Sequence, residues 1–301
     1  YAAEIKKQGW EILKNEETEA QKPNKGFVDG LASKGYKEGQ NITFDKQNAQ
    51  ADQSNLQNIA HRFVNNKVDL ICAIATPAAQ TVANVTSDIP IVATAVTDYK
   101  TAKLVKDDAK PGTNVTGTTD MNPVAEQLDL LLKLVPNAKT IGTIYCSSEV
   151  NSQLQVELLK KAAAAKGITV KEATVSTVND IQQAARSLAG DVQAVYVPTD
   201  NVLASAIPTL ISVTEEAKLP VICAEGGMVR AGGLATLGVD YYKLGFQTGV
   251  MAADILSGKS KPADMAIQAQ KEFKPTINLK EAAKIGLKVP EDLLKGAEVI
   301  K

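Results

Sequence analysis

The chain is poor in the side chains on which most enzymes and nucleic-acid-binding proteins rely. It has one histidine, one tryptophan and three cysteines in 301 residues, and aromatic residues make up 4% of it. The formal net charge is -1 with acids and bases interspersed, so no basic stripe could neutralise a run of phosphates, and no nucleic-acid partner is expected. No apolar run is long enough to cross a bilayer. No signal peptide is recognisable at its start, which leaves the native compartment open.

The same scarcity argues against catalysis. The single histidine, His61, falls in an amphipathic helical pattern away from any strand end, so a Ser-His-Asp triad is not expected. No Gly-rich phosphate loop follows a strand, and Cys146 lacks a histidine to activate it. The widely spaced Cys72, Cys146 and Cys223 form no metal or redox motif and are expected to be buried free thiols, with a disulfide between neighbouring strands as the alternative. We therefore expect no enzyme, no cofactor and no metal.

What the chain does contain is a short apolar run followed at once by small polar residues, four times over. The runs are residues 70–75, 140–145, 194–197 and 220–224. Runs this short and rich in Ile and Val are typical of strands buried on both faces of a parallel sheet. Polar groups at the carboxyl ends of such strands lie where open α/β sheets bind ligands. The pattern therefore predicts a site for a small molecule.

The rest of the sequence alternates strands and helices in two similar halves. In the first half we expect strands over 41–46, 70–75 and 90–94, and helices over 26–35, 54–65 and from Pro77. In the second half we expect strands over 140–145, 168–175, 194–197 and 220–224, and helices over 123–134, 152–166, 179–189 and 201–217. A tail follows with helices over 241–257, 280–285 and 290–297. This order predicts an α/β protein of two Rossmann-like lobes with parallel sheets, binding its ligand between the lobes.

An ordered set of short motifs resembles those of one known family. The motifs are Gln47-Asn48-Ala49-Gln50, Asp52-Gln53-Ser54-Asn55-Leu56, residues 73–80, Thr94-Ala95-Val96-Thr97-Asp98, Asn114-Val115-Thr116-Gly117, residues 147–152, Pro198-Thr199-Asp200-Asn201, Gly238-Val239-Asp240-Tyr241-Tyr242 and residues 277–294. Together they resemble the solute-binding proteins of bacterial ABC importers, in the group associated with tryptophan and tyrosine uptake. The resemblance covers residues 25 to 301.

The resemblance implies a type I periplasmic-binding fold with a hinge of three crossings, near Thr116, near Leu237 and before Thr276. The N-terminal lobe would then comprise residues 1–116 and 237–263, and the C-terminal lobe residues 117–236 and 264–301. It also implies a monomeric extracytoplasmic receptor, in the periplasm or at the cell surface as a lipoprotein. Such a receptor would close over an amino acid, aromatic in this group, and deliver it to an ABC permease.

One segment departs from the family. Its members normally open with a wholly apolar strand and a Glu-His-Pro loop that reaches the ligand, whereas residues 8–24 contain Glu11 and no His-Pro. Trp10 lies in the same segment and could stack on an aromatic ligand or pack in a core. Two alternatives to the transport receptor therefore stay open. One is an engineered binding scaffold with an altered ligand. The other is a ligand-sensing regulatory domain, although no DNA-binding module precedes residue 26.

The first lobe offers the helix start at Thr76-Pro77-Ala78 as its candidate site. Thr is a good helix N-cap and Pro is favoured at the first helical position. The following amides of Ala78 and Ala79 would then point outward at the positive end of the helix dipole, which suits a carboxylate. An ordinary solvated cap is the alternative.

The second lobe offers two polar clusters. Ser147, Ser148, Glu149 and Asn151 follow the strand over 140–145 and could complete an anion or amide contact, or form a plain N-terminal turn.

Asp200 and Asn201 follow the strand over 194–197. A ligand ammonium requires a carboxylate in a dry cleft, for which Asp200 is the first candidate, while capping of the next helix is its alternative role. Glu225, Asp98 and Asp240 lie at or near other strand ends and are further candidates.

Overall fold

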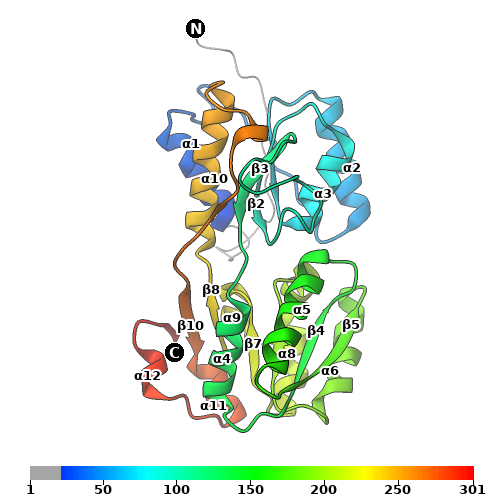
Figure 1. The fold of residues 1–301 in the computed structure, drawn as a ribbon, viewed down its shortest axis with the longest axis vertical. Helices are drawn as coiled ribbons and strands as arrows, with labels where there is room; N and C mark the ends of the chain where they lie inside the picture. The colour runs from blue at the N-terminus through cyan, green and yellow to red at the C-terminus, as the bar shows by residue number, and fades with distance from the viewer. Residues whose placement is uncertain (1–21) are drawn as a thin grey trace. The chain divides into compact units, whose positions relative to one another are not determined.

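A computed structural model of the chain describes residues 22–301. The hypotheses on Trp10 and Glu11 lie outside the described residues. The chain divides into two compact units, coloured along the sequence in Figure 1. Unit 1 ends its first segment at Met121 and also contains Asp240–Lys271, and unit 2 comprises Asn122–Val239 and Glu272–Lys301.

The chain therefore passes between the units after Met121, after Val239 and after Lys271. The boundaries expected at 116, 237 and 263 each fall short of these positions. Strand β3 (Val115–Thr119) pairs with the preceding strand of unit 1, so the chain cannot leave that unit at Thr116. Strand β9 (Gln268–Ala269) pairs with β3, which keeps the chain in unit 1 beyond residue 263.

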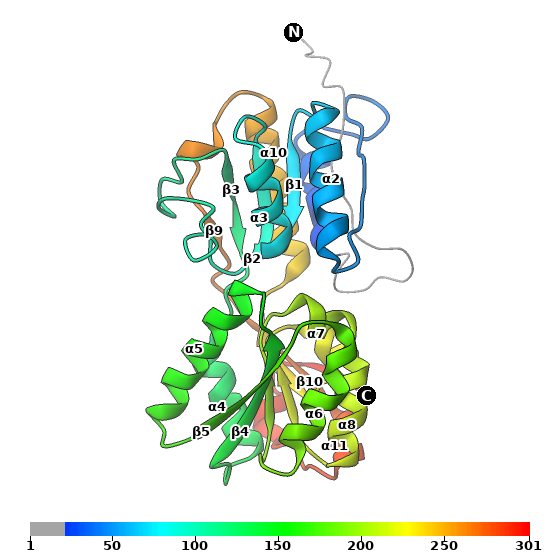
Figure 2. The same cartoon turned by 90° about the vertical axis from the view of Figure 1, so that its right-hand side faces the viewer.

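Unit 1 is built on a four-stranded parallel sheet among its described residues, in the order β1-β2-β3-β9. Its other strands are β1 (Ile71–Ile74) and β2 (Ile91–Val96), and its helices are α1 (Lys22–Ser33), α2 (Gln53–Asn65), α3 (Thr76–Val85), α10 (Tyr241–Leu256) and η3 (Pro262–Asp264). Figure 2 shows α3 on one face of this sheet and α10 on the other. Phe27, Leu31, Cys72, Val92 and Met251 form part of the core that α1 and α10 cover.

Helices α1 and α10 pack with their backbones almost in contact. A Cβ atom on Gly30 would lie 2.2 Å from the carbonyl oxygen of Phe246, and one on Gly249 would lie 2.2 Å from that of Phe27. Real Cβ contacts do not occur at such distances, so only glycine permits this approach. Both helices carry the same spacing, Gly-Phe-x-x-Gly, starting at residues 26 and 245.

Unit 2 is built on a seven-stranded sheet in the order β11-β10-β8-β7-β6-β4-β5. The strands are β4 (Thr140–Cys146), β5 (Thr169–Val175), β6 (Val195–Val197), β7 (Val221–Cys223), β8 (Ala235–Gly238), β10 (Lys274–Asn278) and β11 (Glu298–Ile300). All neighbouring strands are parallel except β10 and β8. The helices are α4 (Val124–Leu134), α5 (Val150–Ala164), η2 (Val178–Asp180), α6 (Ile181–Ala189), α7 (Asn201–Ser205), α8 (Ile207–Glu216), α9 (Gly226–Arg230), α11 (Leu279–Ile285) and α12 (Glu291–Leu294).

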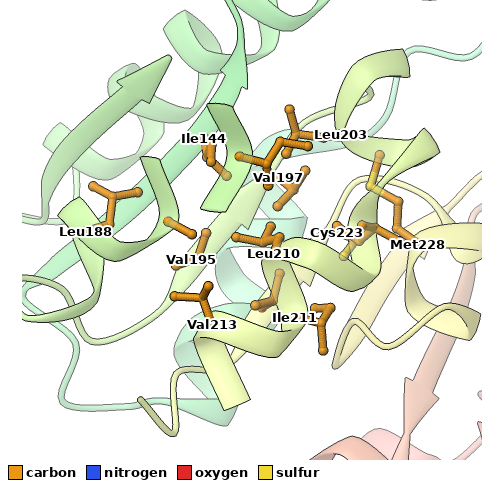
Figure 3. Close-up of a cluster of buried hydrophobic side chains, with 14 of the residues drawn as sticks. Ile144, Leu188, Val195, Val197, Leu203, Leu210, Ile211, Val213, Cys223 and Met228 are labelled. Atoms are coloured by element: carbon orange, nitrogen blue, oxygen red, sulfur yellow. The ribbon is translucent and has the colours of Figure 1, made fainter. Parts of the chain in front are cut away.

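The central strands of unit 2 are buried on both faces, as their continuous apolar runs predict. Val195 and Val197 belong to one apolar cluster, shown in Figure 3, and Tyr196 belongs to another. Alternate side chains of β6 therefore enter different cores. The α/β class with parallel sheets is confirmed, and the three cysteines are buried and free. No helix within residues 22–301 has the length and apolar character needed to cross a membrane.

Several expected elements differ from those observed. The expected strand over 41–46 forms only an isolated bridge between Glu38 and Ile42, although Ile42 still packs in the core. The expected helix over 201–217 is broken at Ala206, and α8 begins at Ile207 with Pro208 in its first turn, where proline has no N–H to continue a preceding helix. The expected helix over 290–297 shortens to α12, and β11 follows it.

Candidate ligand-binding site

Asp200 is held at the end of β6 by hydrogen bonds from its own unit. Its side chain is 1% exposed. Oδ1 accepts from the backbone N of Leu203 at 2.9 Å, and Oδ2 accepts from the backbone N of Cys146 at 2.6 Å and from Oγ of Ser152 at 2.7 Å. The capping role expected as an alternative is thus confirmed, and Asp200 also ties the end of β6 to the end of β4. Its contact with a ligand stays a prediction.

Glu149 lies beside Asp200 and is similarly buried, at 5% exposure. Its Oε1 accepts from the backbone N of Asn201 at 3.0 Å and of Val202 at 3.2 Å. Its Oε2 accepts from Nδ2 of Asn201 at 2.6 Å and of Asn151 at 3.0 Å. Burial, and then the negative charge of Asp200, raise the pKa of Glu149 to about 7. Burial also raises the pKa of Asp200.

This edge of unit 2 therefore gathers acceptors rather than donors. No lysine or arginine within residues 22–301 forms an ion pair with either carboxylate. Two amide oxygens, Oδ1 of Asn151 and Oδ1 of Asn122, are buried and have no hydrogen-bond partner among residues 22–301. Both residues donate through Nδ2 to Thr199, Asn151 to its carbonyl oxygen at 2.8 Å and Asn122 to its Oγ1 at 3.1 Å. A group with hydrogen-bond donors and positive charge would satisfy such an edge.

The two serines after β4 are exposed. Ser147 donates its backbone N to the carbonyl oxygen of Val175 at 2.9 Å, and Oγ of Ser148 lies 3.2 Å from Sγ of Cys146. The structure thus brings Glu149, Asn151, Asp200 and Asn201 into one network and places both serines at its rim. No group of His, Cys, Asp and Glu suited to a metal ion occurs in the described part of the chain.

In unit 1 the helix start differs from the expected one. Ala75 is the N-cap of α3, and Thr76 is its first residue, so the Thr76 side chain does not cap the helix. Its Oγ1 instead accepts from the backbone N of Thr97 at 3.4 Å. We expected the backbone N of Ala79 to be free, but it donates to the carbonyl oxygen of Ala75 at 3.1 Å. The amides of Thr76 and Ala78 donate to no acceptor within residues 22–301, and Pro77 between them has no N–H.

The remaining acidic candidates each cap a local turn or helix. Oδ1 of Asp98 accepts from the backbone N of Thr101 at 2.6 Å, after β2. Glu225 caps α9 through the amides of residues 227 and 228, and Asp240 caps α10 through those of residues 242 and 243. Glu225 follows β7 of unit 2, while Asp98 and Asp240 belong to unit 1. None of the three joins the network around Asp200.

A buried carboxylate in unit 1 was missed. Asp120 follows β3 and is 0% exposed. Its Oδ1 accepts from Oγ1 of Thr97 at 3.0 Å and its Oδ2 from the hydroxyl of Tyr241 at 2.8 Å. Burial raises the pKa of Asp120. The preceding Val-Thr-Gly-Thr-Thr has too few apolar residues to predict a strand, so nothing in the sequence placed Asp120 at a strand end.

The sequence decides the family. A model of the family described as "ABC transporter substrate binding protein" matches residues 16–301. The chain belongs to the substrate-binding proteins of ABC transporters. It is 48% identical over 239 residues to the tyrosine-binding protein of Clostridioides difficile, a match that covers 79% of this chain and 69% of the relative.

Solved structures agree with this family. One is a domain from Streptococcus pneumoniae in complex with L-Trp, 39% identical with a TM-score of 0.92 over 98% of both chains. Another is the ligand-free, open structure of a Clostridium difficile substrate-binding protein with adhesive properties, 42% identical with a TM-score of 0.73 over 99% of both chains. The fold is that of the type I periplasmic binding proteins.

Proposed function

We propose that this substrate-binding protein binds a free amino acid with an aromatic side chain, tyrosine, tryptophan or phenylalanine, and hands it to its ABC permease. Support comes from the tyrosine-binding relative and from the relative solved with L-Trp. Proteins of this family work outside the cytoplasmic membrane. We further propose that the native protein is a monomer, in the periplasm or held at the cell surface by a lipid anchor.

The observation that carries the proposal is that the candidate groups at the strand ends of unit 1 favour a negative charge, whereas those of unit 2 favour a positive charge. In unit 1, the amides of Thr76 and Ala78 at the N-terminus of α3 donate to no acceptor among the described residues, and the helix dipole there favours a negative group. In unit 2, Glu149 and Asp200 are buried acidic groups with which no lysine or arginine of the described part of the chain forms an ion pair. A zwitterionic amino acid carries the complement of both, a carboxylate and an ammonium. A ligand that contacts both sets of groups would favour the conformation in which both contact it.

The other candidates are assigned to the same ligand by position. Thr76-Pro77-Ala78 would hold the carboxylate, and Asn151 and Asn201 would join Glu149 and Asp200 around the ammonium. The hydroxyls of Ser147 and Ser148 would contact the ligand from the rim. Asp98, Glu225 and Asp240 would make lesser contacts, because each is already engaged as a cap.

Three ligands that differ by one group test the proposal. L-tyrosine, L-tyrosinamide without the carboxylate charge, and 3-(4-hydroxyphenyl)propionate without the ammonium are each titrated against the protein, with the unfolding midpoint as readout. A ligand that binds only the folded state adds about 2.7 kcal/mol at a hundred times its Kd. We expect a clear rise with L-tyrosine and little or none with either analogue.

Two variants test whether the carboxylates at the strand ends of unit 2 bind the ligand ammonium. Glu149→Gln should weaken L-tyrosine binding about tenfold or more, because a buried charge partner of the ammonium is lost. Glu172→Gln removes a negative charge from β5 of the same unit, where it pairs with Lys160, and should leave binding unchanged. Equal loss in both variants would contradict the assignment of the ammonium, and no response to any aromatic amino acid would contradict the function itself.

A further inference from the structure

A continuous chain of hydrogen bonds runs through unit 1 from the start of α3 to the start of α10. The backbone N of Thr97 donates to Oγ1 of Thr76 at 3.4 Å, and Oγ1 of Thr97 donates to Oδ1 of Asp120 at 3.0 Å. The Tyr241 hydroxyl donates to Oδ2 of Asp120 at 2.8 Å. Oγ1 of Thr119 adds a bond to the carbonyl oxygen of Thr97 at 2.7 Å. One end of this chain is a candidate ligand residue.

The other end lies where the polypeptide passes between the units. Asp120 stands just before the first crossing, after Met121, and Tyr241 stands just after the second, which follows Val239. The third crossing, after Lys271, is connected to the second by hydrogen bonds between Gln270 and Asp240. The backbone N of Asp240 donates to Oε1 of Gln270 at 2.9 Å, and Nε2 of Gln270 donates to the carbonyl oxygen of Asp240 at 2.5 Å.

The centre of the chain is a carboxylate that tolerates little displacement of its donors. Asp120 is fully buried, and no lysine or arginine within residues 22–301 pairs with it. A buried carboxylate that loses a donor carries a large desolvation cost, so both donors are held firmly in place. A shift of Thr97 at one side would therefore be felt by Tyr241 at the other.

We propose that Thr97, Asp120 and Tyr241 are positioning residues that couple ligand capture at the start of α3 to the three crossing segments. A ligand carboxylate bound to the amides of Thr76 and Ala78 fixes Thr76, and through Thr97 it fixes Asp120 and Tyr241. The inference rests on the proposed function, because it requires an amino acid bound at Thr76.

The test is a double-mutant cycle on the Kd of L-tyrosine, measured by calorimetry. Tyr241→Phe deletes the hydroxyl that reaches Asp120 and should weaken binding about tenfold, within the range of measured coupling between sites. Thr76→Val deletes the hydroxyl that receives the bond from Thr97. Both changes break the same series of hydrogen bonds. The Kd of the double variant should therefore rise at least about threefold less than the product of the two single rises.

Tyr99→Phe is the matched control. The Tyr99 hydroxyl is buried in the same unit, 2.8 Å from the carbonyl oxygen of Ala93 and 3.0 Å from that of Thr118, and neither of these two hydrogen bonds belongs to the series from Thr76 to Tyr241. Its loss should lower the unfolding midpoint, leave the Kd within about twofold, and combine multiplicatively with Thr76→Val.

Multiplicative effects of Thr76→Val and Tyr241→Phe would overturn the inference. So would a Tyr241→Phe variant that unfolds at lower temperature yet binds L-tyrosine like wild type. In both cases the wild-type protein still binds, and the proposed function stands. Failure of the wild-type protein to bind any aromatic amino acid would overturn the function and the coupling together.

Discussion

Nδ2 of Asn201 donates to Oε2 of Glu149 at 2.6 Å, which joins the first residue of α7 to the residue that precedes α5. The backbone N of Asn201 also donates to Oε1 of the same carboxylate at 3.0 Å. The charge of Glu149 is therefore held at one place by a segment from another strand end. Its pKa of about 7, raised by burial and by Asp200, makes that charge sensitive to pH in an ordinary range.

The first prediction is that affinity for L-tyrosine falls in acid. In the proposed site the ligand ammonium would pair with the deprotonated form of Glu149, so a proton would compete with it once the pH drops below about 7. The Kd should be lowest near pH 8, where the ligand ammonium is still protonated, and should rise by up to about tenfold per pH unit between 7 and 5.5. Calorimetry at several pH values measures this. Glu149→Gln should bind weakly with a flatter profile, and a flat profile in the wild-type protein would contradict the role of Glu149.

The second prediction concerns stability and pH at the α8–α11 contact. Glu281 on α11 is 2% exposed, and burial, followed by the nearby carboxyl group of Glu215, raises its pKa from 4.5 to about 7. Nζ of Lys284 lies 2.6 Å from Oε1 of Glu215 and 3.8 Å from Oε2 of Glu281, so Lys284 neutralises mainly Glu215. Both carboxylate oxygens of Glu281 are buried without a hydrogen-bond partner within residues 22–301, so the neutral form of Glu281 is favoured.

The sign follows from the raised pKa. The folded protein binds this proton more tightly than the unfolded chain, so the stabilisation is fully present below pH 4.5 and is lost as the pH rises through 7. Glu281→Gln keeps the size of the side chain and removes the titration, so it should be more stable than wild type at pH 8 by about 1–3 kcal/mol. The gain should disappear near pH 5. Urea unfolding at both pH values measures it, with the exposed Glu216→Gln as control, and equal pH dependence in wild type and Glu281→Gln would contradict the assignment.

The third prediction addresses the close packing of α1 on α10. Gly249→Ala places a Cβ atom 2.2 Å from the carbonyl oxygen of Phe27, which belongs to the backbone and cannot rotate away. The helices must separate, at a cost of about 1–3 kcal/mol in the free energy of unfolding. Gly190→Ala at the end of α6 has no atom within 4 Å of the new Cβ and should be neutral or slightly stabilising. An equally stable Gly249→Ala variant would show that the helices are not this close.

The fourth prediction concerns backbone strain beside the unit 1 site. Ala75 has φ 81° and ψ 153°, a conformation that is nearly exclusive to glycine. Ala75→Gly relieves the strain and should raise the free energy of unfolding by about 1 kcal/mol. Ala73→Gly in the regular strand β1 should lower it instead. If both variants lose stability equally in urea unfolding, Ala75 is not strained.

More of the fold than of the candidate site could be predicted from the sequence. The runs that became β1, β4, β6 and β7 are apolar because those strands are buried on both faces. Strand β3 went unrecognised because its threonines satisfy their hydroxyls inside the core, as Thr118 does with Thr248 at 2.8 Å. In the site, strand ends led to Glu149 and Asp200, since that position follows from local pattern. The hydrogen bond from Asn122 to Thr199 could not be predicted, because the two residues lie 77 positions apart along the chain.

The most direct test of the account is calorimetric titration of the wild-type protein with L-tyrosine and L-tryptophan at pH 8, with L-glutamate and tyramine as comparison ligands. The account predicts saturable one-to-one binding of at least one aromatic amino acid. It also predicts binding at least about a hundredfold weaker for tyramine, which lacks the carboxylate that the start of α3 would hold. Absence of binding by both aromatic amino acids, or equal binding of tyramine, would contradict it.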